Sequence, residues 1–461
     1  MNTDKRRWDV DQEHPEYVAK KATWRMYRDL YVGGERFKEN AGTYLTQRQR
    51  EPGDVYAERL SRAFYENYIG SIVDWYAATL FRREPNLTFL GPNEPARRYF
   101  SSLVQDADLK GTALSDFFRN QFLEGLVTGA SWVLVDFPRV DGMAMTRAEE
   151  EAWGTSRAYL VPYRSEDVIN WGYDDDGVLE WAVVRTSSVK KGNIEDADWR
   201  TETVWRVYER EKFRVFRRER LDGAIVQESE GLHGLAKQRQ VPLFKLNLPE
   251  GQWLLNRAGS LQLEHFNKSN ALSWALTMGL FAMPVVYSER EFSQMVGESY
   301  YIQLGPEDKF GWTEPEGKVY QIAADNLVRL QEEIYRVCYL TQVGGAMGSG
   351  AAQSALAKQR DFAVTVEVLR AFGDAMKEQI RKVLLAIEGA RQDGLDVSVM
   401  GLDEFDIADF GTELEDGKAL LELGFVSPTL KKEVFKKLAL KYLCDARQDV
   451  KDRVVGEIEA A

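Results

Sequence analysis

The sequence is poor in the residues that most often bind metals or form disulfides. Its 461 residues include two cysteines, Cys338 and Cys444, and three histidines, His14, His233 and His265. Two cysteines exclude a disulfide scaffold and suit a reducing cytosol. The histidines are far apart and have no zinc-ligand spacing, so we expect no metal and no cofactor.

Long apolar runs are also scarce. The first residues are followed by polar residues rather than by the apolar core of a signal peptide, so we expect no signal peptide. No charged residue lies between Ser269 and Glu289, but that stretch contains Asn270, Thr277 and Pro284. It is barely long enough to cross a bilayer, so we expect a buried helix that ends at Pro284, with no membrane partner.

Signatures of catalysis are missing. There is no Gly-x-Ser-x-Gly nucleophile elbow. In the glycine run, Gly345 and Gly350 have the spacing of a phosphate-binding loop, but Ala351 and Ala352 stand where lysine and serine or threonine are needed. The acidic run that ends at Gly177 is better explained as a hairpin turn than as a calcium loop. We therefore predict that the chain is not an enzyme.

Basic residues are fewer than acidic residues. Sixty Lys and Arg against 73 Asp and Glu give a formal net charge of −13. This balance argues against a surface that wraps nucleic acid by neutralising phosphates, although it is compatible with a smooth channel that must not grip DNA. The length of 461 residues is enough for two to four domains and a large core, and a hydrophobic content of 44% with 29% charged residues indicates a globular chain.

The first 258 residues predict an α+β region in which helices are segregated from a strand-rich block. Helices are expected over 15–31, with a buried stripe, over 55–81, over 95–104, and from a cap at Thr112 to Gly129. A polar loop is expected from Gly34 to Asp54. Strands are expected over 86–90 and 131–136, and through most of 158–248.

The second half of the chain predicts long helices around a small insert. An apolar helix pattern runs from Ser260 to Met283, and a second begins near Asp325 and ends near Gln342. A glycine run and a helix from Ser354 to about Glu388 follow. A strand over 397–400, a helix over 412–424 and a helix from Pro428 to the C-terminus complete the pattern.

The second of these helices has a narrow apolar stripe. Its members recur at heptad-like spacing and are Leu327, Leu330, Ile334 and Val337. Such a stripe packs against one partner helix, either the preceding helix of the same chain or its copy in a neighbouring subunit. The sequence leaves both possibilities open.

This order of elements resembles the portal proteins of tailed bacteriophages. The residues that carry the resemblance are Leu261 to Asn270, Ile334 to Arg336, the loop from Gly344 to Gly350, and Ser354 to Lys358. In the N-terminal third, Tyr68 to Asp74 followed by Arg83-Glu84-Pro85 is similar to the entry of the portal wing.

The resemblance implies a portal-like α+β fold with named parts. These are a wing over 1–258, a stem helix over 259–283, a clip over 284–322, a second stem helix over 323–342, a tunnel loop over 343–353, a long helix over 354–390, a returning wing strand over 391–410, and a helical crown over 411–461.

The resemblance also implies a function. The chain would form a dodecameric ring at one capsid vertex of the virion, assembled in the host cytoplasm, that conducts double-stranded DNA during packaging and ejection. Its partners would be the large terminase subunit, the major capsid or scaffolding protein, and a head-completion adaptor.

The implied site residues fall into three sets. The channel loop would consist of Val343, Gly344, Gly345, Ala346, Met347, Gly348, Ser349 and Gly350. A basic band facing DNA would contain Lys358 and Arg360. The terminase contact on the clip would contain Glu307, Asp308 and Lys309. Two other classes stay open, namely another virion structural protein, such as an adaptor or minor head protein, and a carboxylate-dependent nucleic-acid enzyme that uses a metal.

Overall fold

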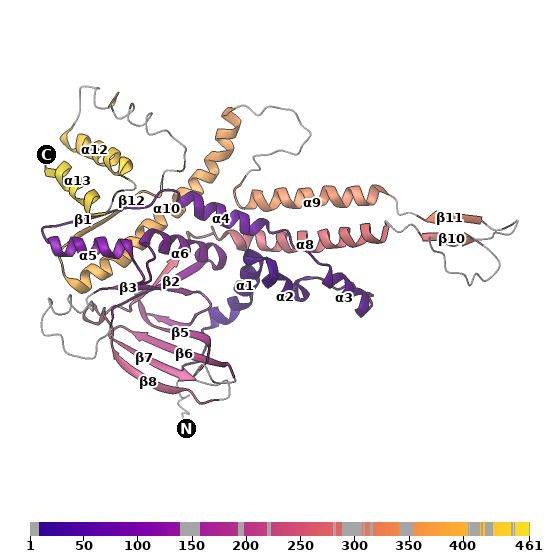
Figure 1. The fold of residues 1–461 in the computed structure, drawn as a ribbon, viewed down its shortest axis with the longest axis horizontal. Coiled ribbons are helices and arrows are strands. Elements are labelled where there is room, and N and C mark those ends of the chain that lie inside the picture. The colour runs from indigo at the N-terminus through magenta and orange to yellow at the C-terminus, as the bar shows by residue number, and fades with distance from the viewer. Residues whose placement is uncertain are drawn as a thin grey trace. The chain divides into compact units, whose positions relative to one another are not determined.

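The computed structural model has an α+β fold (Figure 1). It describes residues 9–138, 157–191, 198–218, 223–279, 283–287, 307, 309–313, 317–340, 355–403, 405, 415, 418–419, 427–443, 446 and 448–460. The chain divides into two compact units. We call Met1–Arg28, Val73–Leu255 and Gln353–Ala461 the sheet unit, and Asp29–Ile72 with Asn256–Ala352 the helix-pair unit.

Two antiparallel sheets form the centre of the sheet unit, as the sequence predicts for residues 158–248. One has the order β4-β5-β6-β7-β8 and the other β3-β2-β9. Their strands are β2 (Ala130–Asp136), β3 (Tyr159–Arg164), β4 (Val168–Tyr173), β5 (Leu179–Lys190), β6 (Arg200–Glu209), β7 (Lys212–Arg218), β8 (Val226–Leu232) and β9 (Leu243–Asn247), with the short helix η1 (Ala236–Gln238) before β9.

The predicted turn between β4 and β5 is confirmed. The Asp174 carboxylate accepts hydrogen bonds from the backbone N–H groups of Asp176, at 3.0 Å, and Val178, at 2.8 Å. Its oxygens therefore serve the backbone of the turn, as expected for a hairpin.

Helix α6 (Leu114–Thr128) precedes β2 and ends at Gly129, as predicted. Gly129 has φ 87°, a left-handed conformation that glycine adopts without steric cost. The expected cap at Thr112 is wrong. Ala113 occupies the capping position, and the Thr112 hydroxyl instead donates to the Asp108 carboxylate at 2.8 Å.

The predicted long helix is α10 (Ala355–Arg391), and the strand after it is β12 (Asp396–Met400). β12 pairs antiparallel with β1 (Asn86–Leu90), which confirms that a strand returns to the N-terminal region. Gly373 of α10 allows this return, because a Cβ there would lie 2.0 Å from the Leu402 carbonyl oxygen.

The C-terminal residues form two helices, α12 (Pro428–Tyr442) and α13 (Gln448–Ala460), where one was expected. The break lets the buried Gln448 amide donate to the Leu87 carbonyl of β1. α13 also contacts α5 (Glu94–Gln105), the helix expected over 95–104. Most of the helix expected over 412–424 lies outside the described residues.

The helix expected over 55–81 is two helices, α3 (Gly53–Ser61) and α4 (Tyr68–Leu80). Side-chain amides hold the backbone between them in a non-helical form. Asn270 accepts from the Phe64 N–H at 3.0 Å and donates to the Phe64 carbonyl at 2.9 Å, and Asn67 accepts from the Gly70 N–H at 2.7 Å. Local periodicity favours one helix, but these hydrogen bonds compete with the helical ones.

Upstream, α1 (Pro15–Val32) is confirmed, while the expected polar loop contains α2 (Gly34–Tyr44). Phe37 of α2 is buried and stacks on Tyr65, with ring centroids 4.0 Å apart. It also meets Phe266 edge-on at 4.9 Å. This aromatic packing stabilises a helix whose other residues are mostly polar.

The helix-pair unit is built on α8 (Leu254–Gly279) and α9 (Gly317–Val337). Three contacts show that they are antiparallel. The Arg257 guanidinium lies 4.9 Å from the Tyr339 ring centroid, Lys268 donates to Asn326 at 2.9 Å, and the Tyr320 hydroxyl reaches the Ala275 carbonyl at 3.4 Å. Figure 1 shows the two helices side by side.

Both helices differ in extent from the sequence prediction. α8 ends at Gly279, and Met283 begins the strand β10 (Met283–Tyr287), which pairs antiparallel with β11 (Lys309–Thr313). α9 begins at Gly317 and ends at Val337, because Tyr339 has φ 60° and the Leu340 N–H bonds back to the Tyr335 carbonyl at 2.9 Å.

Candidate functional site

The apolar stripe predicted on α9 faces largely inward. Ile334 is buried, and Leu327, Leu330 and Val337 are half-buried. Cys338 follows the helix and is buried as well, and burial raises the pKa of its thiol to about 12. The stripe therefore belongs largely to the interior of the helix-pair unit, and the cysteine is a neutral packing group.

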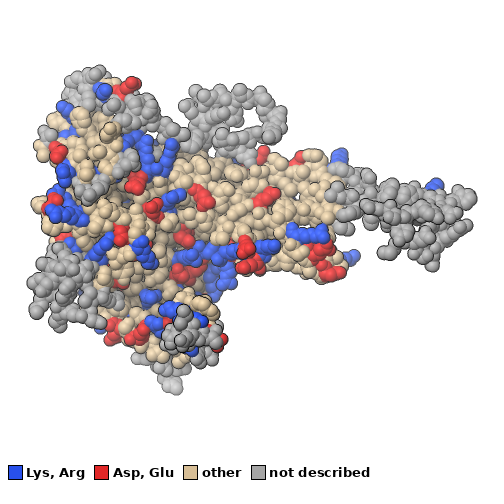
Figure 2. All heavy atoms as spheres, viewed as in Figure 1, with Lys and Arg blue, Asp and Glu red and all other residues tan. Residues whose placement is uncertain are grey.

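A second set of apolar side chains on the helix pair is exposed. On α9, Val319 is 63% exposed, Ile322 60% and Val328 48%; Leu276 of α8 is 44% exposed. Val319 and Val328 are nine residues apart, which is about two and a half turns of an α-helix, so they lie on opposite sides of α9. Figure 2 shows few charges on the visible face of α8 and α9.

Polar side chains of α8 bind the segment between α2 and α4. Asn267 accepts from the Thr46 N–H at 2.8 Å and donates to the Tyr44 carbonyl at 3.0 Å. Gln262 donates to the Glu66 carbonyl at 2.8 Å, and Asn270 binds both backbone groups of Phe64. The sequence analysis missed this role, although the amides stand out in a helix of few charges.

The buried His265 belongs to the same helix. It meets the Tyr68 ring edge-on at 5.0 Å, and its Nε2 lies 3.6 Å from the Glu66 carboxylate. Burial lowers the pKa of the His265 imidazole, and the nearby Glu66 carboxylate raises it by a smaller amount.

The predicted clip contains the β10–β11 hairpin, which follows α8 and precedes α9 in the chain. Glu307 and Lys309 are exposed, as is Tyr287 at the end of β10 that pairs with Lys309. Asp308 lies outside the described residues. The side chains described at this hairpin thus include both signs of charge and an aromatic ring.

The predicted channel loop, Val343 to Gly350, lies outside the described residues. Lys358 and Arg360 lie in the first turns of α10, and their side chains are likewise outside the described part. Their roles stay predictions.

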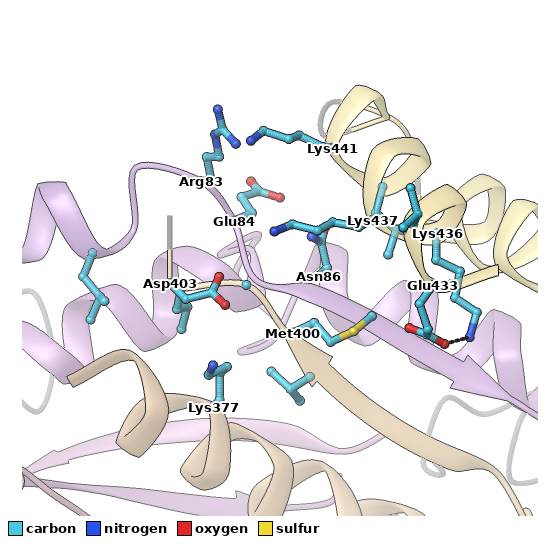
Figure 3. Close-up of a pocket in the computed structure, with 16 residues that line it drawn as sticks. Arg83, Glu84, Asn86, Lys377, Met400, Asp403, Glu433, Lys436, Lys437 and Lys441 are labelled. Carbon is cyan, nitrogen blue, oxygen red and sulfur yellow. Dashed lines mark hydrogen bonds and ion pairs between the residues drawn. The ribbon is translucent and has the colours of Figure 1, made fainter. Parts of the chain in front are cut away.

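A charged cavity in the sheet unit has a volume of about 450 Å³. Figure 3 shows its polar side chains, among which Arg83 and Lys441 point toward each other. Of its basic groups, Lys436 pairs with Glu433 at 3.0 Å and with Glu459 at 2.6 Å, and Lys377 pairs with Asp374 at 2.8 Å. These lysines are therefore engaged in local ion pairs.

Helix α12 supplies most of the basic residues of this cavity. It contains five lysines and one glutamate, in a chain whose net charge is negative: Lys431, Lys432, Glu433, Lys436, Lys437 and Lys441. The sequence analysis did not single it out, although its local excess of lysine was visible there.

Within the described ranges, no three His, Cys, Asp or Glu residues are grouped in a way that could hold a metal ion. Likewise, none of the described helices has both the length and the apolar character that crossing a membrane requires.

No family model matches the sequence, and no curated protein matches it. Solved structures do resemble the fold. One is the neck of an empty gene transfer agent (GTA) particle with C6 symmetry. It is 12% identical to this chain and has a TM-score of 0.43, and the match covers 78% of this chain and 88% of that chain.

Two others come from native particles. The virion of a native gene transfer agent particle is 12% identical with a TM-score of 0.38, covering 83% of this chain and 93% of that chain. The neck of a native GTA particle with C12 symmetry has the same identity and TM-score, covering 80% and 90%. At this identity and these TM-scores, the similarity by itself assigns neither a family nor a function.

Proposed function

We propose that this chain is a structural component of a phage-like virion and, within it, the portal protein. In this proposal, twelve copies form a ring through which double-stranded DNA enters and leaves the capsid. The observation that carries the proposal is the antiparallel α8–α9 pair, with apolar side chains exposed on opposite sides of α9.

This arrangement favours a closed ring over a two-fold dimer. A two-fold interface joins the same patch on both subunits and would leave one of the two sides of α9 exposed. In a ring, each subunit uses one patch toward one neighbour and a different patch toward the other. Val319 and Val328 are then both covered, each by a different neighbour.

The element order supports the remaining assignments. The β10–β11 hairpin, whose second strand begins at Lys309 directly after Glu307 and Asp308 in the sequence, is the proposed docking point for the large terminase subunit and later for a head-completion adaptor. A mixed-charge surface suits a contact that forms and is exchanged. The segment 343–353 is the proposed tunnel loop. Its four glycines and lack of charge suit a loop that touches DNA without binding phosphates.

Negative-stain imaging and native mass measurement of the purified chain test the ring. We expect closed rings with an axial hole, and twelve subunits when the protein is taken from particles. A chain that stays monomeric at high concentration and has no ring in the particle would overturn the proposal.

Deletion of Gly344 to Gly350 separates a DNA conduit from another ring-shaped virion protein. We expect rings to form as in the wild type, while the DNA content of the particles falls. Normal packaging and retention in the deletion variant would leave a structural ring without the proposed channel role.

A further inference from the structure

A second, smaller cavity in the sheet unit has a volume of about 200 Å³. Its walls come from α1, β2, β4, β9 and the turn that follows β9. Four tryptophans and one lysine are among the residues that line it, namely Trp24, Trp132, Trp171, Trp253 and Lys245. Pockets for drug-sized ligands usually start at about 300 Å³, so only a small group fits here.

Lys245 is held inside this cavity by two indole rings. It pairs across the sheet with Trp132, and its Nζ lies 5.6 Å from the Trp132 ring centroid and 5.8 Å from that of Trp171. Among the described residues, no acceptor lies within hydrogen-bond distance of its Nζ and no carboxylate within ion-pair distance, although the Glu16 carboxylate lies near enough to attract it. Burial lowers the pKa of its ammonium group, and the Glu16 carboxylate raises it by a smaller amount.

Trp24 also lines this cavity, and its indole N–H is a buried donor. Its side chain is 6% exposed, and its Nε1 has no acceptor in the described part of the chain. Other indole N–H groups of this unit do have an acceptor. Trp253 Nε1 donates to the Val127 carbonyl at 3.1 Å, and Trp205 Nε1 donates to Asp11 at 2.8 Å. Since buried indole N–H groups usually have a partner, Trp24 indicates a missing acceptor.

The charges at the cavity limit what can enter. Lys20 is paired with Glu16 at 2.6 Å, and Glu250 also lines the cavity. The two lysines and two glutamates give a formal sum of 2 − 2 = 0. A polyanion such as a nucleic acid would meet the two glutamates, whereas a single negative group can reach the one unpaired ammonium.

One wall of the cavity is closely packed against the backbone. Gly129 has no Cβ, and one built there would lie 3.1 Å from the Trp253 ring, so this glycine allows the ring to approach the backbone. Indole rings on several sides suit a flat or short apolar group attached to the anion.

We propose that this cavity binds a carboxylate on a small flat or apolar group, with Lys245 as its ion-pair partner and Trp24 Nε1–H as a hydrogen-bond donor. The site is separate from the residues assigned to ring formation and DNA passage. The carboxylate belongs either to a free small molecule or to the C-terminus of a peptide.

Calorimetric titration with benzoate tests the site, and benzamide is the matched neutral ligand. We expect saturable binding of benzoate. Benzamide should bind at least about tenfold more weakly than benzoate, since hydrogen bonds to charged groups are about twice as strong as neutral ones. Lys245→Met should weaken benzoate binding about tenfold or more, and Trp24→Phe should weaken it about three- to tenfold.

Lys212→Met is the control, because Lys212 is exposed on β7 and does not line the cavity. It should bind benzoate as the wild type does. Thermal unfolding of each variant establishes that it is folded. Equal benzoate affinity of the wild type and Lys245→Met, or no saturable binding to the wild type, would overturn the proposal.

The peptide Gly-Gly-Phe, with a free or an amidated C-terminus, distinguishes the two sources. Tighter binding of the free-acid peptide than of benzoate, lost on amidation and in Lys245→Met, assigns the site to a peptide terminus. Binding of benzoate alone assigns it to a free small molecule.

Discussion

The sheet unit and the helix-pair unit bury their side chains in different ways. In the sheet unit, one continuous apolar core joins the strands and includes Trp205, which is fully buried. In the helix-pair unit, a smaller aromatic cluster around Phe37 is supplemented by amide hydrogen bonds from α8, while Val319 and Ile322 stay exposed.

The two units differ in the size of their apolar core rather than in exposure alone, because the sheet unit also exposes apolar side chains such as Val189 and Trp199. A unit with a large apolar core gains its stability from its own burial. A helix pair that leaves apolar groups exposed on two sides is stabilised further when copies cover them. The sheet unit thus has the larger core of its own, and the helix-pair unit is where we expect subunits to meet.

The largest effect on folding should come from the core of the sheet unit. Trp205→Ala removes a fully buried indole and should lower the free energy of unfolding by about 3–5 kcal/mol. Urea denaturation followed by circular dichroism measures it. Trp199, 68% exposed just before β6, is the matched control, and Trp199→Ala should change stability by less than about 0.5 kcal/mol. Equal losses in the two variants would contradict the core described.

The next effect should come from the amides of α8. Asn270→Ala leaves both backbone groups of Phe64 without their partner and should cost about 1–3 kcal/mol. Hydrogen exchange should accelerate at residues 62–67 in this variant. Ser273→Ala, one turn further on an exposed position of the same helix, should leave exchange there unchanged. Unchanged protection in Asn270→Ala would show that the amide does not hold this segment.

A smaller effect should appear as pH dependence. The pKa of His265 is lowered in the folded state, so the unfolded state binds more protons below the ordinary histidine value of 6.5. Stability should therefore fall as the pH decreases from 7.5 to 5.5, by about 1 kcal/mol per unit of pKa difference or slightly more. In His265→Gln, the free energy of unfolding, measured by denaturation at pH 7.5 and at pH 5.5, should differ less between the two pH values than in the wild type. The same slope in both proteins would exclude His265 as its source.

The smallest effect on folding should accompany the largest effect on assembly. Val319→Gln with Ile322→Gln should change the stability of the isolated chain by less than about 0.5 kcal/mol, because both side chains are exposed. Ring formation, measured by native mass, should be lost or strongly weakened. Val189→Gln, an equally exposed site on β5, should assemble normally. Intact rings in the double variant would place the subunit contact elsewhere.

The sequence alone determined features that depend on near neighbours in the chain. The long helix α10, the buried strand β2, the end of α6 at Gly129 and the turn at Asp174 to Gly177 were all predictable. Their signals are apolar periodicity, glycine in a left-handed conformation and an acidic side chain that bonds the next backbone groups. Each of these acts within a few residues.

Only the tertiary structure decided features that depend on partners far away in the chain. The break between α3 and α4 is held by Asn270, more than 200 positions from Phe64, and β1 finds its partner strand only after α10. The cavity around Lys245 joins Trp24, Trp132 and Trp171 from three separate elements. No local sequence pattern encodes such long-range contacts. The energy of a side-chain hydrogen bond or a cation–π contact depends on distance in space and not on separation along the chain.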